Sequence, residues 1–174
     1  MRINLCVVAI SSAFASGNGY AANEPASSPL HALEIAAGQW DYHGENLAAA
    51  GQKAETWVWD EACGWSPNQA FMACSFTMKD STKTVKSHAV TTYNSSDHSY
   101  WHYEMFDSDG SGAEPFISRM TITGNTWTSI GKADQKSYRV IYRYLSPVKV
   151  TVVVDMSSDD VHWVQVAQGE GFKK

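Results

Sequence analysis

About ten short segments of the sequence alternate polar with apolar side chains or run through β-branched and aromatic residues, each bounded by turn residues. No stretch after residue 38 keeps a helical period. Gly124-Asn125 and Ser146-Pro147 are typical tight connections between neighbouring strands. We therefore predict an all-β fold, a closed antiparallel up-and-down barrel of about eight to ten strands. The predicted strands are Gln39–Glu45, Lys53–Asp60, Gln69–Met78, Thr84–Tyr93, Ser99–Phe106, Phe116–Thr123, Thr126–Gly131, Ser137–Leu145, Val148–Asp155 and Val161–Gln168.

The first residues have the layout of a secretory signal rather than of a folded domain. Arg2 precedes an apolar run that ends near Ala15, and small residues follow as far as Ala22. We predict a signal peptide over residues 1–22, cleaved between Ala15 and Ala22, then a disordered lead-in over 23–31 and one barrel domain over 32–174. The domain should open with a short helical turn from Leu33 to Gly38. This organisation predicts a periplasmic or secreted protein without membrane insertion once the signal is removed.

The charge balance limits the partners of the domain. The sequence has 13 Lys and Arg against 18 Asp and Glu, and its basic residues cluster only at Lys173-Lys174. Binding to nucleic acid or to an anionic membrane is therefore disfavoured. Its aromatic content is high, with seven Trp, eight Tyr and six Phe, which suits strands and barrel interiors.

The cysteine pattern predicts one disulfide bond. Cys63 and Cys74 are the two cysteines that remain after the signal is removed, because Cys6 belongs to its apolar run. An even pair in an oxidising compartment favours a bridge over two buried thiols. Cys63 comes at the end of one predicted strand and Cys74 lies within the next, so the two side chains could face each other across a hairpin.

Sequence motifs for catalysis or metal binding are weak. The chain has no Gly-x-Ser-x-Gly, Ser-x-x-Lys, His-Glu-x-x-His or phosphate-loop pattern, so nothing argues for an enzyme. The segment 107–112 resembles the start of a calcium loop, but its twelfth position is Ser118 rather than Glu, which favours an acidic hairpin loop. His98, Tyr100 and His102 share one predicted strand face, which we interpret as polar surface because two imidazoles do not complete a zinc site. We predict no cofactor and no metal.

Strand alternation also predicts which side chains face the interior of the barrel. The expected inward set is Val148, Val150, Val152, Val154, Tyr138, Val140, Tyr142, Tyr144, His162, Val164 and Val166. This set contains few charges, so any unfilled space inside should be apolar.

Gly38-Gln39-Trp40, placed after a helical turn and at the start of the first strand, resembles the Gly-x-Trp signature of lipocalin and calycin barrels. A fuller likeness is to a bacterial family of lipocalin-like barrels known only as a domain of unknown function. The segments that carry it are Leu33–Trp40, Trp57–Trp59, Tyr93–Tyr100, Gly124–Trp127 and Ser157–Trp163.

The resemblance implies the fold and a cavity for a small apolar molecule, and it transfers no activity. Lipocalins also tend to place a late-strand Arg against the signature Trp, for which Arg143 is available here. Some lipocalin-like barrels hold haem through one late-strand His, which would be His162.

Three functional hypotheses follow. The first is an exported barrel that binds a small apolar or amphipathic molecule, such as a fatty or aromatic guest, in its lumen. The second is a haem or other cofactor barrel centred on His162, against which a hydrogen-bonded core histidine is favoured. The third is a filled barrel that acts through its surface as an envelope or interaction module. The predicted ligand-binding residues are Trp40, Tyr42, Trp57, Trp59, Tyr138, Tyr142, Val150, Val152, His162 and Val164.

Overall fold

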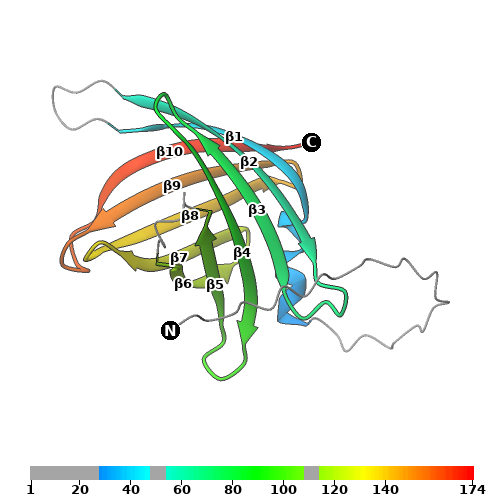
Figure 1. The fold of residues 1–174 in the computed structure, drawn as a ribbon. Coiled ribbons are helices and arrows are strands. Elements are labelled where there is room, and N and C mark those ends of the chain that lie inside the picture. Colours follow the sequence, from blue (N-terminus) through cyan, green and yellow to red (C-terminus); the bar gives the residue numbers. More distant parts are fainter. Residues whose placement is uncertain (1–27, 48–53, 108–113) are drawn as a thin grey trace, which may run out of the picture.

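Ten antiparallel strands form one closed barrel in the computed structural model, which describes residues 28–47, 54–107 and 114–174 (Figure 1). Each strand pairs with the next along the chain, and β1 closes the ring by pairing with β10. The up-and-down barrel is therefore confirmed, with the upper number of predicted strands. The strands are β1 (Gly38–Asn46), β2 (Glu55–Trp65), β3 (Met72–Lys79), β4 (Thr84–Asn94), β5 (Ser99–Phe106), β6 (Phe116–Thr123), β7 (Thr126–Ala133), β8 (Lys136–Ser146), β9 (Lys149–Ser157) and β10 (Val164–Lys173).

The interior follows the alternation of the strands. Trp40 and Tyr42 on β1 are almost fully buried, and so are Val150 and Val152 on β9. Two-residue spacing places such side chains on the same face of a strand, where they pack against the aromatic residues of β2, β7 and β8. The wall of the barrel thus buries its apolar face inward, as the sequence pattern predicts. The inward placement of Val148 is wrong, because it lies in the turn before β9 and is 56% exposed.

The last strand differs from its prediction at both ends, and glycine explains why it continues further. We expected a strand over Val161–Gln168, whereas β10 begins at Val164 and continues through Gly169 and Gly171. A Cβ on Gly171 would lie 2.4 Å from a ring carbon of Tyr42, and one on Gly169 would lie 2.6 Å from the ring of Trp57. The glycines therefore leave room for these rings to lie against the strand instead of ending it.

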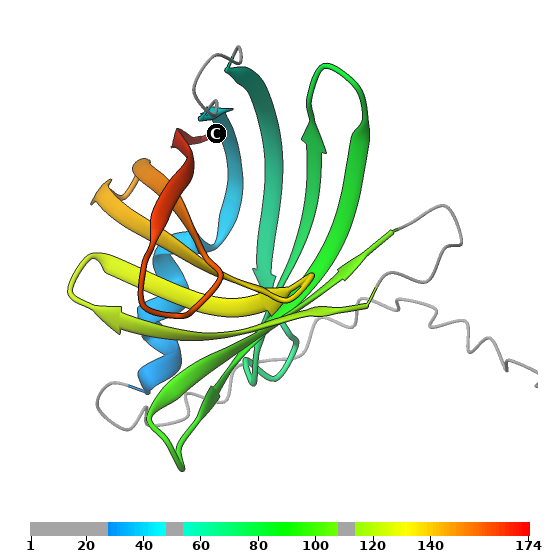
Figure 2. The same ribbon diagram turned by 90° about the vertical axis from the view of Figure 1, so that its left-hand side faces the viewer.

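One end of the barrel is closed by the 3-10 helix η1 (Pro29–Ala36), drawn in blue in Figure 2. Leu33 is 1% exposed, the Trp40 indole Nε1 donates to the Ala36 carbonyl at 3.0 Å, and the Tyr100 hydroxyl donates to the Pro29 carbonyl at 2.5 Å. The predicted helical turn is confirmed but starts earlier, so residues 29–31 belong to this helix rather than to a disordered lead-in. Pro29 suits a helix start because its missing N–H would have no helical partner.

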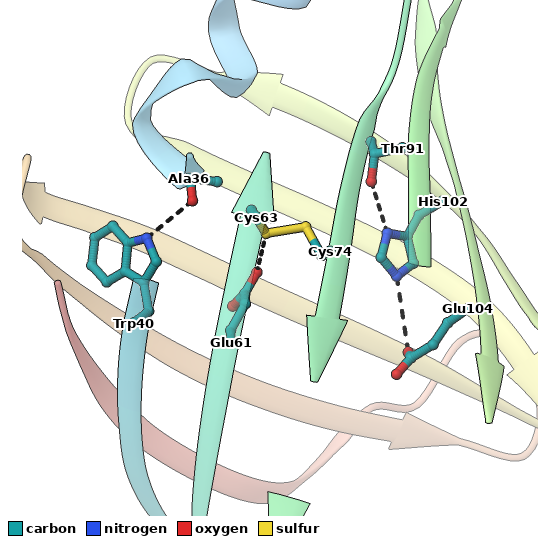
Figure 3. The surroundings of a disulfide bond; sticks show 8 residues. All are labelled: Ala36, Trp40, Glu61, Cys63, Cys74, Thr91, His102 and Glu104. Atoms are coloured by element: carbon teal, nitrogen blue, oxygen red, sulfur yellow. Dashed lines mark hydrogen bonds and ion pairs between the residues drawn. A yellow bond between two sulfur atoms is a disulfide. The ribbon is translucent and has the colours of Figure 1, made fainter. Parts of the chain in front are cut away.

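The predicted disulfide is present. Cys63 on β2 and Cys74 on β3 lie directly opposite each other in the strand register, with their Cα atoms 4.1 Å apart. The bond joins two strands that are already neighbours, close to the helix-covered end of the barrel (Figure 3).

Some predictions lie outside the described residues: the signal peptide over 1–22, most of the lead-in, and nearly all of the acidic loop that follows Asp107. Within the described part of the chain, no helix is long and apolar enough to cross a membrane.

Candidate functional site

The barrel encloses a cavity beneath η1 that is lined by side chains from the helix and from eight strands. Its volume is about 100 Å³. The lining residues are Leu33, Ala36, Tyr42, Trp59, Glu61, Met72, Cys74, Phe76, Thr91, His102, Glu104, Phe116, Ser118, Met120, Trp127, Ser129, Val140, Tyr142 and Tyr144. Most of this lining is apolar or aromatic, but it includes two carboxyl groups and one imidazole.

Glu61 is the most unusual of these side chains. It lies on β2 between Trp59 and Cys63 on the inward face, and the surface it exposes faces the cavity. Burial raises its pKa from the usual 4.5 to about 7, a rise that a hydrogen bond from Tyr42 opposes and the charge of Glu104 reinforces. Glu61 is therefore a carboxyl group that changes charge near neutral pH.

The protonated form of Glu61 has a partner in the disulfide. Its Oε1 lies 2.9 Å from Sγ of Cys63 (Figure 3). Because a disulfide sulfur carries no hydrogen, this contact is a hydrogen bond only when Glu61 is protonated and donates. Glu61, Cys63 and Cys74 are also close enough to resemble a metal site, but the bond between the sulfurs removes the thiolates that a metal would need.

A second polar group in the cavity comes from β4 and β5. Ser87 donates to Glu104 Oε1 at 2.5 Å, and Glu104 Oε2 lies 3.9 Å from Nε2 of His102. Nδ1 of the same imidazole lies 2.9 Å from the hydroxyl of Thr91. The His102 ring is therefore held by a hydrogen bond at Nδ1, its Nε2 lies within ion-pair distance of the Glu104 carboxylate, and the residue lines the cavity (Figure 3).

Aromatic side chains of β1, β2 and β3 lie next to Glu61. Tyr42 and Trp59 stack with centroids 4.7 Å apart, and Phe76 meets Trp59 edge-on at 5.4 Å. Nε1 of Trp59 is buried and has no hydrogen-bond acceptor among the described residues. A buried indole N–H normally has a partner, so this donor is available to a polar group in the cavity.

The three tyrosines of the lining remain neutral. Burial, reinforced by the charge of Glu61, raises the pKa of Tyr42, Tyr142 and Tyr144 far above the usual 10. Their hydroxyl groups therefore stay protonated and contribute no charge to the cavity.

The predicted ligand-binding residues divide into three sets. Tyr42, Trp59 and Tyr142 line the cavity. A second set, buried in the wall beside it, consists of Trp40, Trp57, Val150 and Val152. Tyr138 lies on β8 outside the cavity lining, and the remaining two lie at or beyond the start of β10: His162 and Val164.

The inward placement of His162 is wrong. It precedes β10, its side chain is 84% exposed, and its Nδ1 lies 2.7 Å from Asp159 Oδ2. Asp159 also accepts from the backbone N–H groups of Val161 and His162, which fixes a turn where we expected a strand. Val164 opens β10 and is 63% exposed. Haem ligation inside the barrel by His162 is therefore excluded.

The basic partner of Trp40 is also different from the one expected. Arg143 is exposed, whereas Nζ of Lys173 lies 5.4 Å from the centroid of the Trp40 ring and donates to the Ile35 carbonyl at 3.4 Å. A cation–π contact at the signature tryptophan is thus made by a lysine from the final strand. The register explains the choice, since Trp40 lies opposite Lys173.

Sequence reasoning missed the polar lining of the cavity. It treated His102 as polar surface and expected few inward charges, yet His102 and Glu104 face the lumen together, while His98 lies in the turn before β5 and contacts the hydroxyl of Tyr93. The signal was present in the alternation. Glu61 is two residues after Trp59, and Glu104 two after His102.

Fold and site together define a closed lipocalin-like β-barrel with a small aromatic and acidic cavity. No family model matches the sequence, and no curated protein matches it. Two solved structures share the fold. The S-type phycobiliprotein lyase CPES from Guillardia theta is similar with a TM-score of 0.61 and 9% identity, over 86% of this chain and 94% of that chain. Rv2717c from M. tuberculosis is similar with a TM-score of 0.59 and 10% identity, over 85% of this chain and 98% of that chain. At such identities the likeness concerns the fold alone.

Proposed function

We propose that this protein is an exported barrel that binds a small molecule in its lumen. The observation that carries the proposal is the cavity beneath η1, where aromatic rings surround a few polar groups. Binding pockets for small molecules generally combine a mostly apolar lining with a small number of polar groups that orient the guest. The unpaired indole N–H of Trp59 and the hydroxyl groups of Ser118 and Ser129 are such groups.

The size of the cavity sets the size of the guest. An engineered apolar cavity of about 150 Å³ binds benzene, so a volume of about 100 Å³ accepts a group smaller than a single ring without rearrangement. A ring or a larger guest requires side chains such as Met72 and Phe116 to change rotamer. Met suits this role because it has three rotatable bonds. A filled barrel that acts through its surface is the competing function.

A pair of substitutions on β8 separates these functions. Val140 lines the cavity, whereas its neighbour Ile141 lies on the opposite face of the strand. Val140→Phe should fill the cavity and weaken binding of small aromatic probes at least tenfold, while Ile141→Phe should leave binding unchanged. Titration of tryptophan fluorescence can measure this, since Trp59 and Trp127 line the cavity. If no small apolar or aromatic probe binds the unaltered protein at millimolar concentration, the binding function is wrong.

A further inference from the structure

We infer that the guest is an organic cation, a positively charged nitrogen on an apolar or aromatic body, whose charge is neutralised by the carboxylate of Glu61. This inference rests on the proposed lumenal binding and names its ligand class. It deepens that function because it replaces the apolar or amphipathic guest that the sequence predicted with a guest whose charge is opposite to that of the cavity.

The cavity has an excess of acidic groups. Its lining contains Glu61, Glu104 and His102, and it contains neither Lys nor Arg among the described residues. His102 contacts Glu104, so even a protonated imidazole offsets the charge of only one of the two carboxylates. An ionised Glu61 therefore has no cationic partner within the lining. A buried carboxylate without a partner is costly, and a cationic guest would remove that cost.

The groups that face Glu61 from the neighbouring elements cannot supply the missing positive charge. Its neighbours on β3 are Phe76 and Cys74, which carry none, and β1 contributes the neutral phenol of Tyr42. The titratable groups that face it are Tyr42 from β1, His102 and Glu104 from β5, and Tyr142 and Tyr144 from β8. The tyrosines stay neutral and Glu104 has the same sign. The empty barrel can therefore relieve the charge of Glu61 only by adding a proton to it.

The aromatic lining favours the same ligand class. Tyr42 donates a hydrogen bond to Glu61 and Phe76 lies opposite it in the strand register, while Trp59 precedes it by two residues and contacts both rings. Aromatic rings attract ammonium and guanidinium groups through their negative faces, and aromatic side chains are the usual partners of quaternary ammonium ligands. A fatty acid has the wrong charge for this site, because its carboxylate would meet two others.

Binding of a cation must then be coupled to the release of a proton from Glu61. The pKa of Glu61 is about 7 in the empty barrel, so a cation that requires the carboxylate displaces a proton from Glu61 at pH 6 but not at pH 8. The ionised fraction rises about tenfold between these values, and the affinity should rise by the same factor. An uncharged guest of the same shape should show no such increase.

Phenyltrimethylammonium and tert-butylbenzene form a matched pair for the test, because they share one shape and differ in charge, and neither titrates. Isothermal titration of the full chain at pH 8 should show at least tenfold tighter binding of the cation, and this preference should shrink about tenfold at pH 6. Titration at pH 6 in buffers of different ionisation enthalpy should show about one proton released for each cation bound.

Two variants locate the effect. Glu61→Gln should abolish both the preference for the cation and its pH dependence, while Glu55→Gln, an exposed carboxyl group on the same strand, should change neither. If Glu61→Gln does not fold, the pH dependence and proton release of the unaltered protein decide the question. Tight binding of tert-butylbenzene without preference for the cation would overturn the charge inference and leave lumenal binding intact. Absence of binding by both probes would overturn both.

Discussion

Replacement of Glu61 by Gln should stabilise the protein at alkaline pH and have little effect in acid. The folded protein holds the Glu61 proton with a pKa of about 7, whereas the unfolded chain holds it with the usual 4.5. Between these values unfolding releases a proton, so stability falls as pH rises through the window. At about 1.4 kcal/mol for each pH unit, the full difference is about 3 kcal/mol. A glutamine keeps the shape without the charge and avoids this loss.

Urea unfolding at a series of pH values from 4.5 to 8.5 measures the effect. The free energy of unfolding of Glu61→Gln, minus that of the unaltered protein, should be near zero at the lowest pH and rise by about 3 kcal/mol above pH 7. Glu55→Gln controls for the loss of one carboxyl group from β2, and its difference curve should be flat. A flat curve for Glu61→Gln, or one that falls with pH, would refute the burial of Glu61 without a cationic partner.

Two further predictions concern the wall of the barrel. Replacement of both Cys63 and Cys74 by Ala should lower the free energy of unfolding by about 3 kcal/mol, because the bridge closes a short loop of the unfolded chain. Thiol titration of the unfolded, unreduced protein should find no free thiol, and two titratable thiols would contradict the bond. Gly171→Ala should cost about 1–3 kcal/mol in thermal or urea unfolding, since its Cβ would overlap Tyr42. Gly64→Ala, which meets no atom within 4 Å, should cost much less, and equal losses would argue against the close packing of β10 on Tyr42.

The strand pattern of this barrel was predictable because each strand buries one face. β5 and β6 match the predicted bounds, and most other strands differ by a few residues at their ends. The errors at β10 have a local cause. The predicted strand ends at Gln168, directly before Gly169, whereas in the structure Gly169 and Gly171 continue it and make room for aromatic rings that come from strands distant in the sequence.

The candidate site was less predictable, because the sequence pattern shows which residues share a face but does not show what they meet. Trp59 and Glu61 share the inward face of β2, and that much follows from their spacing. That Glu61 lies near Glu104 rather than near a lysine depends on the curvature of the closed barrel, which alternation does not encode. His162 shows the opposite case, since the Asp159 carboxylate accepts from the backbone N–H groups of Val161 and His162 and fixes a turn where the apolar neighbours suggested a strand.

Lumenal binding of a small molecule is tested most directly by a crystal structure of the protein grown with phenyltrimethylammonium. The account predicts electron density for the probe inside the cavity, with its ring against Trp59 and its ammonium group next to the carboxylate of Glu61. Density for the probe only outside the barrel, with the cavity filled by its own side chains, would contradict it.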